Sequence, residues 1–223
     1  MGIKAAANKT ELCAIRFFHD KISDTKHRLP DNSPLDLQKR RFGGVDRTWS
    51  GKEFNLFISK SLELGHEEYA AIFCLARYAG LRLHEIFRID TQIAAKAVKT
   101  GTIEIRGKGG LQRSVPINLS IEIELNKMLA GTPRGHKLFV TPDDKTHLAM
   151  HRFESFISYH KKAIQDADSS RPLHFHGLRH TCAAEWYKEY IESGMSEFEA
   201  RKAVAKLLGH SRDDVVRVYL ASL

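Results

Sequence analysis

Hydrophobic residues recur at helical spacing along most of the chain. The 223-residue sequence predicts helices over residues 10–28, 50–65, 67–80, 120–130, 148–167, 176–193 and 196–208, a short helix after Leu81 and a last helix that contains Tyr219. Ser50 and Glu53 form a capping-box pattern at the start of one helix, and Ser211 with Asp214 repeats it before the last. The chain is therefore predicted to be mostly helical.

Polar and apolar residues alternate in one region. Residues 102–106 and 113–117 alternate on either side of the glycine-rich turn GKGGLQ, which predicts an antiparallel hairpin. The segment KLFV at 137–140 is expected to add a third strand. The predicted fold class is α+β, mostly helical with a small antiparallel sheet.

A stretch rich in Pro and Gly separates the first helix from the others. It carries the basic triplet Lys39, Arg40 and Arg41, and its composition predicts an extended linker. The triplet is either a solvated surface run or a basic strap over phosphates. We expect an amino-terminal helix and basic linker over residues 1–48 and a second domain over residues 49–223.

The net charge points to a polyanionic partner. With 35 Lys and Arg against 27 Asp and Glu, the formal net charge is +8 and the isoelectric point is about 9.4. Nucleic acid is the leading partner and a membrane surface the second. No apolar run approaches the roughly 20 residues of a spanning helix, and no secretory signal opens the sequence. Three widely spaced cysteines without a CxxC pattern argue against disulfides, so we expect a cytoplasmic, DNA-associated protein that does not enter membranes.

The densest chemical signal is HFHGLRHT. His176, Arg179 and His180 share one helix face at i, i+3 and i+4. These residues alone fit a basic surface stripe, an anion site or, through the HxxxH spacing, a zinc pair. The zinc interpretation lacks the glutamate of HExxH and has no cysteine ligand nearby, so no metal site is predicted.

Three other features are weak when each is taken alone. The stretch GTIEIRGKGG is not a Walker motif, because five residues instead of four separate Gly101 from Gly107, and Gly109 follows Lys108 where the motif has Ser or Thr. It predicts a hairpin tip that carries one lysine. Arg82 and Glu85 could be an ordinary surface ion pair. Tyr219, nine residues after His210, could be a core tyrosine.

The combination and order of these features resemble the catalytic domain of the tyrosine recombinases, the phage integrase family. The matching stretches are AGLRLHEIFRID, IRGKGGLQRSVPI, HFHGLRHT, and LLGH with Tyr219 nine residues after its histidine. The resemblance covers about residues 49–220. In the first 48 residues, AIRFFHDKI weakly resembles the last helix of the core-binding domain that precedes the catalytic domain in this family.

The resemblance implies strand cleavage and rejoining of double-stranded DNA through a 3'-phosphotyrosine, without metal or nucleotide cofactor. Tyr219 would be the nucleophile, and Arg82 with Arg179 would stabilise the attacked phosphate. Lys108 would protonate the leaving 5' oxygen. His176 would accept the proton of Tyr219 or orient the phosphate, and His210 would be a second hydrogen-bond donor to the phosphate. Which of Lys108 and the histidines is acid and which is base stays open. Supporting positions are Glu85 and His180, and expected contacts with DNA are Lys39, Arg40, Arg41 and Arg113.

Such a recombinase is expected to act as a homo-oligomer on DNA. Two alternatives keep the fold: an accessory DNA-binding protein that does not cleave, and an enzyme that relaxes supercoils in the manner of type IB topoisomerases. A zinc hydrolase is the remaining enzymatic alternative.

Overall fold

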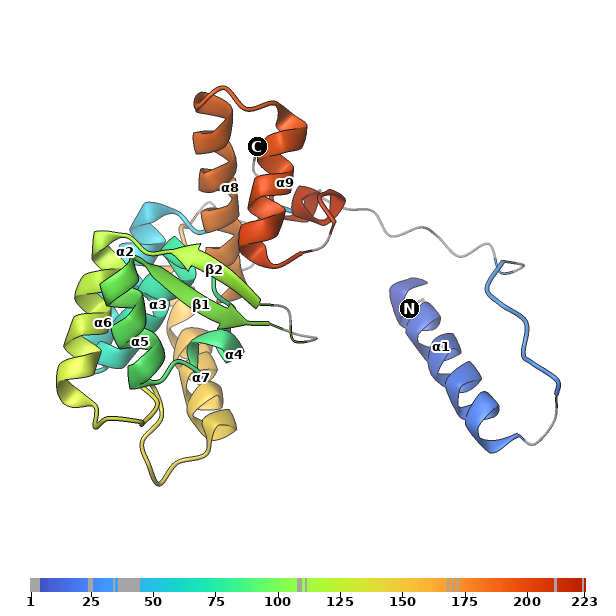
Figure 1. The fold of residues 1–223 in the computed structure, drawn as a ribbon, viewed down its shortest axis with the longest axis horizontal. Helices are drawn as coiled ribbons and strands as arrows, with labels where there is room; N and C mark the ends of the chain where they lie inside the picture. Colours follow the sequence, from blue (N-terminus) through green and yellow to red (C-terminus); the bar gives the residue numbers. More distant parts are fainter. Residues whose placement is uncertain are drawn as a thin grey trace. The chain divides into compact units, whose positions relative to one another are not determined.

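The computed structural model describes residues 5–23, 26–33, 35, 45–107, 110, 112–167, 169, 171, 173–210, 212–221 and 223 (Figure 1). Contacts divide the chain into two units, Met1–Phe42 and Gly43–Leu223. Lys39, Arg40, Arg41 and Lys108 lie outside the described residues.

In its described residues, the first unit has the helix α1 (Ala5–Ile22), and residues 26–33 after it form neither helix nor strand. The helix predicted over residues 10–28 is present but lies nearer the amino terminus. Arg16 ties the helix to the segment after it, because its Nε donates to the Pro30 carbonyl at 2.7 Å and its Nη2 to Asn32 Oδ1 at 2.6 Å.

The second unit is mostly helical, as predicted. Its helices are α2 (Gly51–Glu63), α3 (Glu67–Ala79), α4 (Leu83–Ile86), α5 (Thr91–Thr100), α6 (Leu119–Gly131), α7 (Thr146–Ile164), α8 (His176–Glu192) and α9 (Glu197–Leu208). The capping box that opens α2 is confirmed: Glu53 N–H donates to Ser50 Oγ, and Ser50 N–H donates to the Glu53 carboxylate.

Helix α3 lies at the centre of this unit, where it packs against α2, α6 and α8 (Figure 1). Most of its residues from Tyr69 to Ala79 are buried, which matches the largely apolar stretch in the sequence. A run of aromatic rings links it to neighbouring elements. Phe73 lies 5.3 Å from Phe57 of α2 and 5.1 Å from Phe153 of α7 between ring centroids, and Trp49 lies 4.9 Å from Phe57. Trp49 is thereby anchored in the core.

The predicted hairpin is confirmed as β1 (Thr102–Arg106) and β2 (Gln112–Pro116), paired antiparallel with Ile103 opposite Val115. The third strand predicted at 137–140 is wrong, since the sheet has two strands in the described part of the chain. Lys137 forms only an isolated bridge with Asp90. Pairing stops there because Asp90 caps α5 through the amides of Gln92 and Ile93, which turns the chain away.

Helices α8 and α9 pack side by side at the carboxyl end of the unit (Figure 1). The last predicted helix is a short 3-10 helix, η2 (Asp214–Val218), and Tyr219 follows it directly instead of lying inside it. Tyr219 is held there by its amide, which donates to the Val216 carbonyl at 2.7 Å. Ser211, the other half of the predicted capping box, lies outside the described residues.

Candidate active site

Tyr219 lies in a cluster of three histidines. It is only 6% exposed and packs on Leu208 and Val216 in a small apolar cluster between α8, α9 and η2. Its hydroxyl lies 3.1 Å from His210 Nε2. Its ring centroid is 4.5 Å from that of His180 and 5.9 Å from that of His176. Tyr219 and His176, which are 43 positions apart in the chain, thus lie close together.

Arg179 joins the ends of two helices beside this tyrosine. Its side chain is 1% exposed, Nη1 donates to the Gly80 carbonyl at the end of α3, and Nη2 donates to the Leu208 carbonyl at the end of α9. Helix carboxyl ends carry partial negative charge, so they stabilise the buried cation. Cζ of Arg179 lies 5.8 Å from the Tyr219 ring centroid. Burial lowers the pKa of Arg179 to about 10, which leaves it positive at neutral pH.

The histidines are uncharged at neutral pH. Burial first, and then the positive charge of Arg179, lower the pKa of His210 to about 4. Burial also lowers the pKa of His180 to about 3. His176 is exposed as a residue, but desolvation of its imidazole together with Arg179 and Arg82 still holds its pKa below the ordinary range. Neutral imidazoles can accept protons as well as donate hydrogen bonds.

Arg82 begins α4 and is held by Glu85. The Arg82 amide donates to Glu85 Oε2 at 2.8 Å, and its Nη1 donates to Oε1 at 3.0 Å. About a quarter of the Arg82 side chain is exposed, while the Glu85 side chain is fully buried. Burial by itself would raise the pKa of Glu85, but hydrogen bonds from Arg113 and from the Arg82 amide lower it to about 2. The carboxylate is therefore charged throughout the physiological range.

Arg113 is not on the surface, where a contact with DNA would require it. We expected a contact with the DNA backbone, but Arg113 is 7% exposed and its two Nη atoms donate to Glu85 at 2.9 and 2.7 Å. The reason is the hairpin register: Arg113 pairs with the buried Ile105, so its side chain faces inward.

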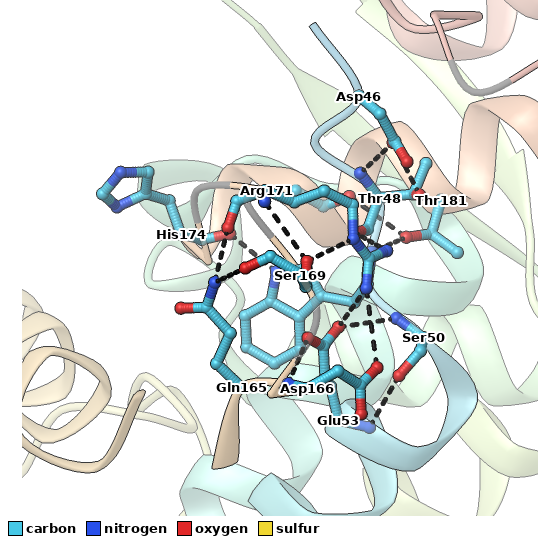
Figure 2. Close-up of polar contacts among 12 residues, drawn as sticks. Asp46, Thr48, Ser50, Glu53, Gln165, Asp166, Ser169, Arg171, His174 and Thr181 are labelled. Atoms are coloured by element: carbon cyan, nitrogen blue, oxygen red, sulfur yellow. Dashed lines mark hydrogen bonds and ion pairs between the residues drawn. The ribbon is translucent and has the colours of Figure 1, made fainter. Parts of the chain in front are cut away.

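The start of α8 is held by the segment that precedes α2 (Figure 2). Trp49 Nε1 donates to the His174 carbonyl at 2.9 Å, and the Trp49 amide donates to Thr181 Oγ1 at 2.8 Å. A Cβ added at Gly177 would lie 2.2 Å from the Arg47 carbonyl oxygen, so the two backbones touch only because residue 177 is glycine. This contact lies directly beside His176.

A second group of polar contacts fixes the loop before α8 (Figure 2). Glu53 is 1% exposed and accepts from the Asp166 amide at 3.1 Å and from Arg171 Nη2 at 3.3 Å. Arg171 also donates from Nη1 to the Thr48 carbonyl at 2.8 Å. The loop that leads to His176 is thus tied to both ends of the residue 48–53 segment.

Two grooves open on the site. One, of about 510 Å³, is lined by Arg82 and His176 together with residues of α7, among them Ser158 and Lys161. The other, of about 1190 Å³, lies between β2 and α9 and reaches His210. Arg82, His176 and His210 are therefore accessible from the surface, whereas Tyr219 and Arg179 line neither groove and are buried.

The chain is similar to known proteins in sequence and in fold. The sequence pattern of the phage integrase family matches residues 52–223. The chain belongs to the phage integrase family. Tyrosine recombinase XerD of Bradyrhizobium diazoefficiens is 22% identical over 241 residues, which cover 98% of this chain and 72% of that protein.

Solved structures of integrases and recombinases share the fold. XerA recombinase aligns with a TM-score of 0.57 at 17% identity, over 98% of this chain and 72% of that one. A lambda integrase dimer bound to a COC' core site aligns with a TM-score of 0.66 at 17% identity, over 97% of this chain and 59% of that one. Family membership and these relatives support a site-specific tyrosine recombinase that acts in DNA recombination or integration.

In this integrase-family chain, the structure brings together five of the six predicted catalytic residues: Arg82, His176, Arg179, His210 and Tyr219. Tyr219 is in ring, cation–π or hydrogen-bond contact with His176, Arg179 and His210, and Arg82 lines one groove together with His176. The sixth, Lys108, lies outside the described residues. Within the described ranges, no group of three or more His, Cys, Asp or Glu could hold a metal ion, and no helix is long and apolar enough to cross a membrane.

Sequence reasoning missed the residues that hold the site in place. Trp49, Glu53 and Arg171 were not singled out as contributors to it. Gly177, inside HFHGLRHT, was the available signal, because a glycine between two functional residues of a helix often marks a close backbone approach.

Proposed function

We propose that this chain cleaves and rejoins strands of double-stranded DNA through a 3'-phosphotyrosine at Tyr219. The observation that carries the proposal is the 3.1 Å approach of Tyr219 Oη to His210 Nε2 beside the buried cation Arg179. A hydroxyl in contact with a neutral base and next to a fixed positive charge is arranged as a nucleophile for an anionic substrate. The family of the chain supports the same reaction.

The two arginines would hold the attacked phosphate. Arg82 is partly exposed and Glu85 fixes its orientation, so its outer N–H groups can reach a ligand in the groove that His176 also lines. Each Nη of Arg179 uses one N–H on a carbonyl, which leaves the other for a phosphate oxygen. Losing one fixed donor to the transition state costs about 3–4 kcal/mol of barrier.

Proton transfers complete the reaction. As Tyr219 Oη bonds to phosphorus, its proton passes to His210, whose Nε2 is neutral and within hydrogen-bond distance. The bond from phosphorus to the 5' oxygen breaks, and Lys108 protonates that oxygen, as the family resemblance implies. A new 5' hydroxyl can then attack the phosphotyrosine and release Tyr219, so no nucleotide is consumed.

The partners follow from the same proposal. DNA is the substrate, a view supported by the charge of +8 and by integrase relatives solved with DNA. We propose that the catalytic domain spans residues 49–223 and that copies assemble on DNA, as in the lambda integrase dimer. Lys39, Arg40 and Arg41 are proposed to contact the DNA backbone.

A nicked suicide duplex tests the chemistry. The purified full chain is incubated with labelled duplexes that carry the junction sequences of its own genetic element, with EDTA present. Covalent adducts are separated on a denaturing gel, and the linked peptide is mapped. We expect an adduct at Tyr219 that Tyr219→Phe abolishes while DNA affinity is retained.

Two results would contradict the proposal. An adduct that survives in Tyr219→Phe would place the nucleophile elsewhere. Salt-sensitive DNA binding without any adduct would favour the accessory DNA-binding alternative, and relaxation of supercoils without sequence preference would favour the topoisomerase alternative.

A further inference from the structure

Arg113 is a buried cation that the proposed reaction does not use. It lies on β2 with 7% of its surface exposed, and both Nη atoms bind the Glu85 carboxylate. Its Nε has no hydrogen-bond partner among the described residues. Burying an arginine without full hydrogen bonding is unfavourable, so a functional reason for its place is worth seeking.

The Glu85 carboxylate links Arg113 to Arg82 by hydrogen bonds. Each Glu85 oxygen accepts one bond from Arg113 and one from Arg82. One of the Arg82 bonds comes from its backbone and the other from its guanidinium. The bidentate Arg113 pair fixes the plane of the carboxylate, and that plane sets the direction of the Arg82 side chain.

Arg113 also packs against Gly209, the residue before His210. A Cβ added at Gly209 would lie 3.2 Å from both Cδ and Nη1 of Arg113, so the arginine packs closely on that backbone. Gly209 ends α9 in a left-handed conformation with φ of 69°, and His210 follows it. The ring of His210 then reaches the Tyr219 hydroxyl.

We propose that Arg113 is a positioning residue that sets the spacing between Arg82 and His210, through Glu85 on one side and Gly209 on the other. This inference rests on the proposed function, because it concerns the same reaction. Arg113 holds the phosphate-binding arginine and the histidine beside the nucleophile at one distance, although they come from α4 and from the end of α9.

Removing Arg113 leaves a buried carboxylate with less compensation. The charged and titratable groups around Glu85 are Arg82 and His84 from α4 and Arg113 from β2. Without Arg113, burial raises the pKa of Glu85, and below that pKa the protonated carboxyl loses the charge that holds Arg82. The loss of activity should therefore deepen as the pH falls and diminish as it rises.

The test compares Arg113→Met with Arg113→Lys in single-turnover cleavage of the nicked duplex from pH 5.5 to 9. Arg113→Met should lower the cleavage rate about 100-fold at pH 7, the usual effect of a misplacement of about 1 Å. DNA affinity should change by less than about threefold, since both Nη atoms of Arg113 are bound to Glu85 and are not proposed to contact phosphate. Arg113→Lys should recover part of the rate. Lys99→Met, which removes an exposed cation on α5, is the matched control and should behave like the parent.

The pH profile separates positioning from a general loss of stability. The parent should show a flat rate at the acid end, and Arg113→Met should show a new decline there. His210 could also cause such a decline, because Arg113 contributes to the low pKa of His210. Adding Glu85→Gln to Arg113→Met should remove the decline if Glu85 is the group that titrates. A decline that persists in the double variant would overturn the role of Glu85.

An NMR titration keeps the inference testable without DNA. The carboxyl carbon of Glu85 in the free full-length chain should titrate with a low pKa in the parent and a clearly raised one in Arg113→Met. An unchanged Glu85 titration, or a loss of rate that is equal at every pH, would overturn the inference. A parent chain that forms no adduct would refute the proposed function alone, because the titration still decides the coupling of Glu85 to Arg113.

Discussion

Gly177→Ala should disable cleavage while leaving DNA binding in place. The new methyl group would lie 2.2 Å from the Arg47 carbonyl oxygen and 2.7 Å from the Trp49 ring. An ordinary contact begins at 3.4 Å, so the segment must move away from α8 by about 1.2 Å. Because the obstacle is backbone, a rotamer change cannot relieve it.

The estimated energies favour a net loss of folding stability. Overpacking of this kind costs about 1–3 kcal/mol, and the two Trp49 hydrogen bonds to His174 and Thr181 contribute about 1 kcal/mol each if they are lost. The gain in helix preference from Gly to Ala is at most about 1 kcal/mol. A net loss of about 2 kcal/mol would lower the melting temperature by about 4–8 °C. A shift of this size beside His176 should lower the cleavage rate about 100-fold.

Three measurements check this prediction: thermal melting, DNA affinity and single-turnover adduct formation on the nicked duplex. Gly51→Ala is the matched control, because it makes the same change in the first turn of α2, where nothing lies within 4 Å of the added Cβ. It should be neutral or slightly stabilising. If Gly177→Ala melts at the parent temperature and cleaves within about threefold of the parent rate, the close contact does not position the site and the reasoning is wrong.

Other variants test the stability of the buried polar groups. The pKa of Glu85 is about 2 in the folded chain and ordinarily 4.5, so its carboxylate adds stability above pH 4.5 that is lost as the pH falls toward 2. Glu85→Gln should therefore weaken the pH dependence of urea unfolding across that window, by about 3 kcal/mol. His180 has a folded pKa of about 3 against 6.5, so its stabilising effect is complete above pH 6.5 and declines below it. Urea unfolding of His180→Gln from pH 7 to 4 should show a smaller slope than the parent. Arg171→Met removes a donor from the buried Glu53 and should cost about 1–3 kcal/mol in thermal melting, whereas loss of the exposed Arg152 should cost less than about 1 kcal/mol. Equal effects of these two arginine variants would show that burial does not set the cost.

Local patterns in the sequence determined most helices and strands and the set of candidate catalytic residues. The capping box at Ser50 and the alternation in 102–106 depend only on neighbouring residues, and both are confirmed. The order of the candidate residues along the chain pointed to the family that the family pattern over residues 52–223 shows, although identity to XerD is only 22%.

The errors lie where local signals compete with long-range pairing. KLFV has strand-forming residues, but no extended partner is available once Asp90 turns into α5. The segment before Tyr219 has a helical pattern, but it forms only a 3-10 turn that presents the tyrosine to α8. A basic residue such as Arg113 is ordinarily exposed, and no local pattern in the sequence predicts that Glu85 is its carboxylate partner.

Only the tertiary structure decided how the site is held. Glu85 and Arg113 are 28 residues apart, and Trp49 and Thr181 are 132 residues apart. Periodicity states which face of an element is buried, but not which distant element covers it. The sequence therefore determined which groups could perform the chemistry, whereas the packing of α3, α8 and α9 determined that Tyr219, His210 and Arg179 meet, because their contacts exist only when those helix ends converge.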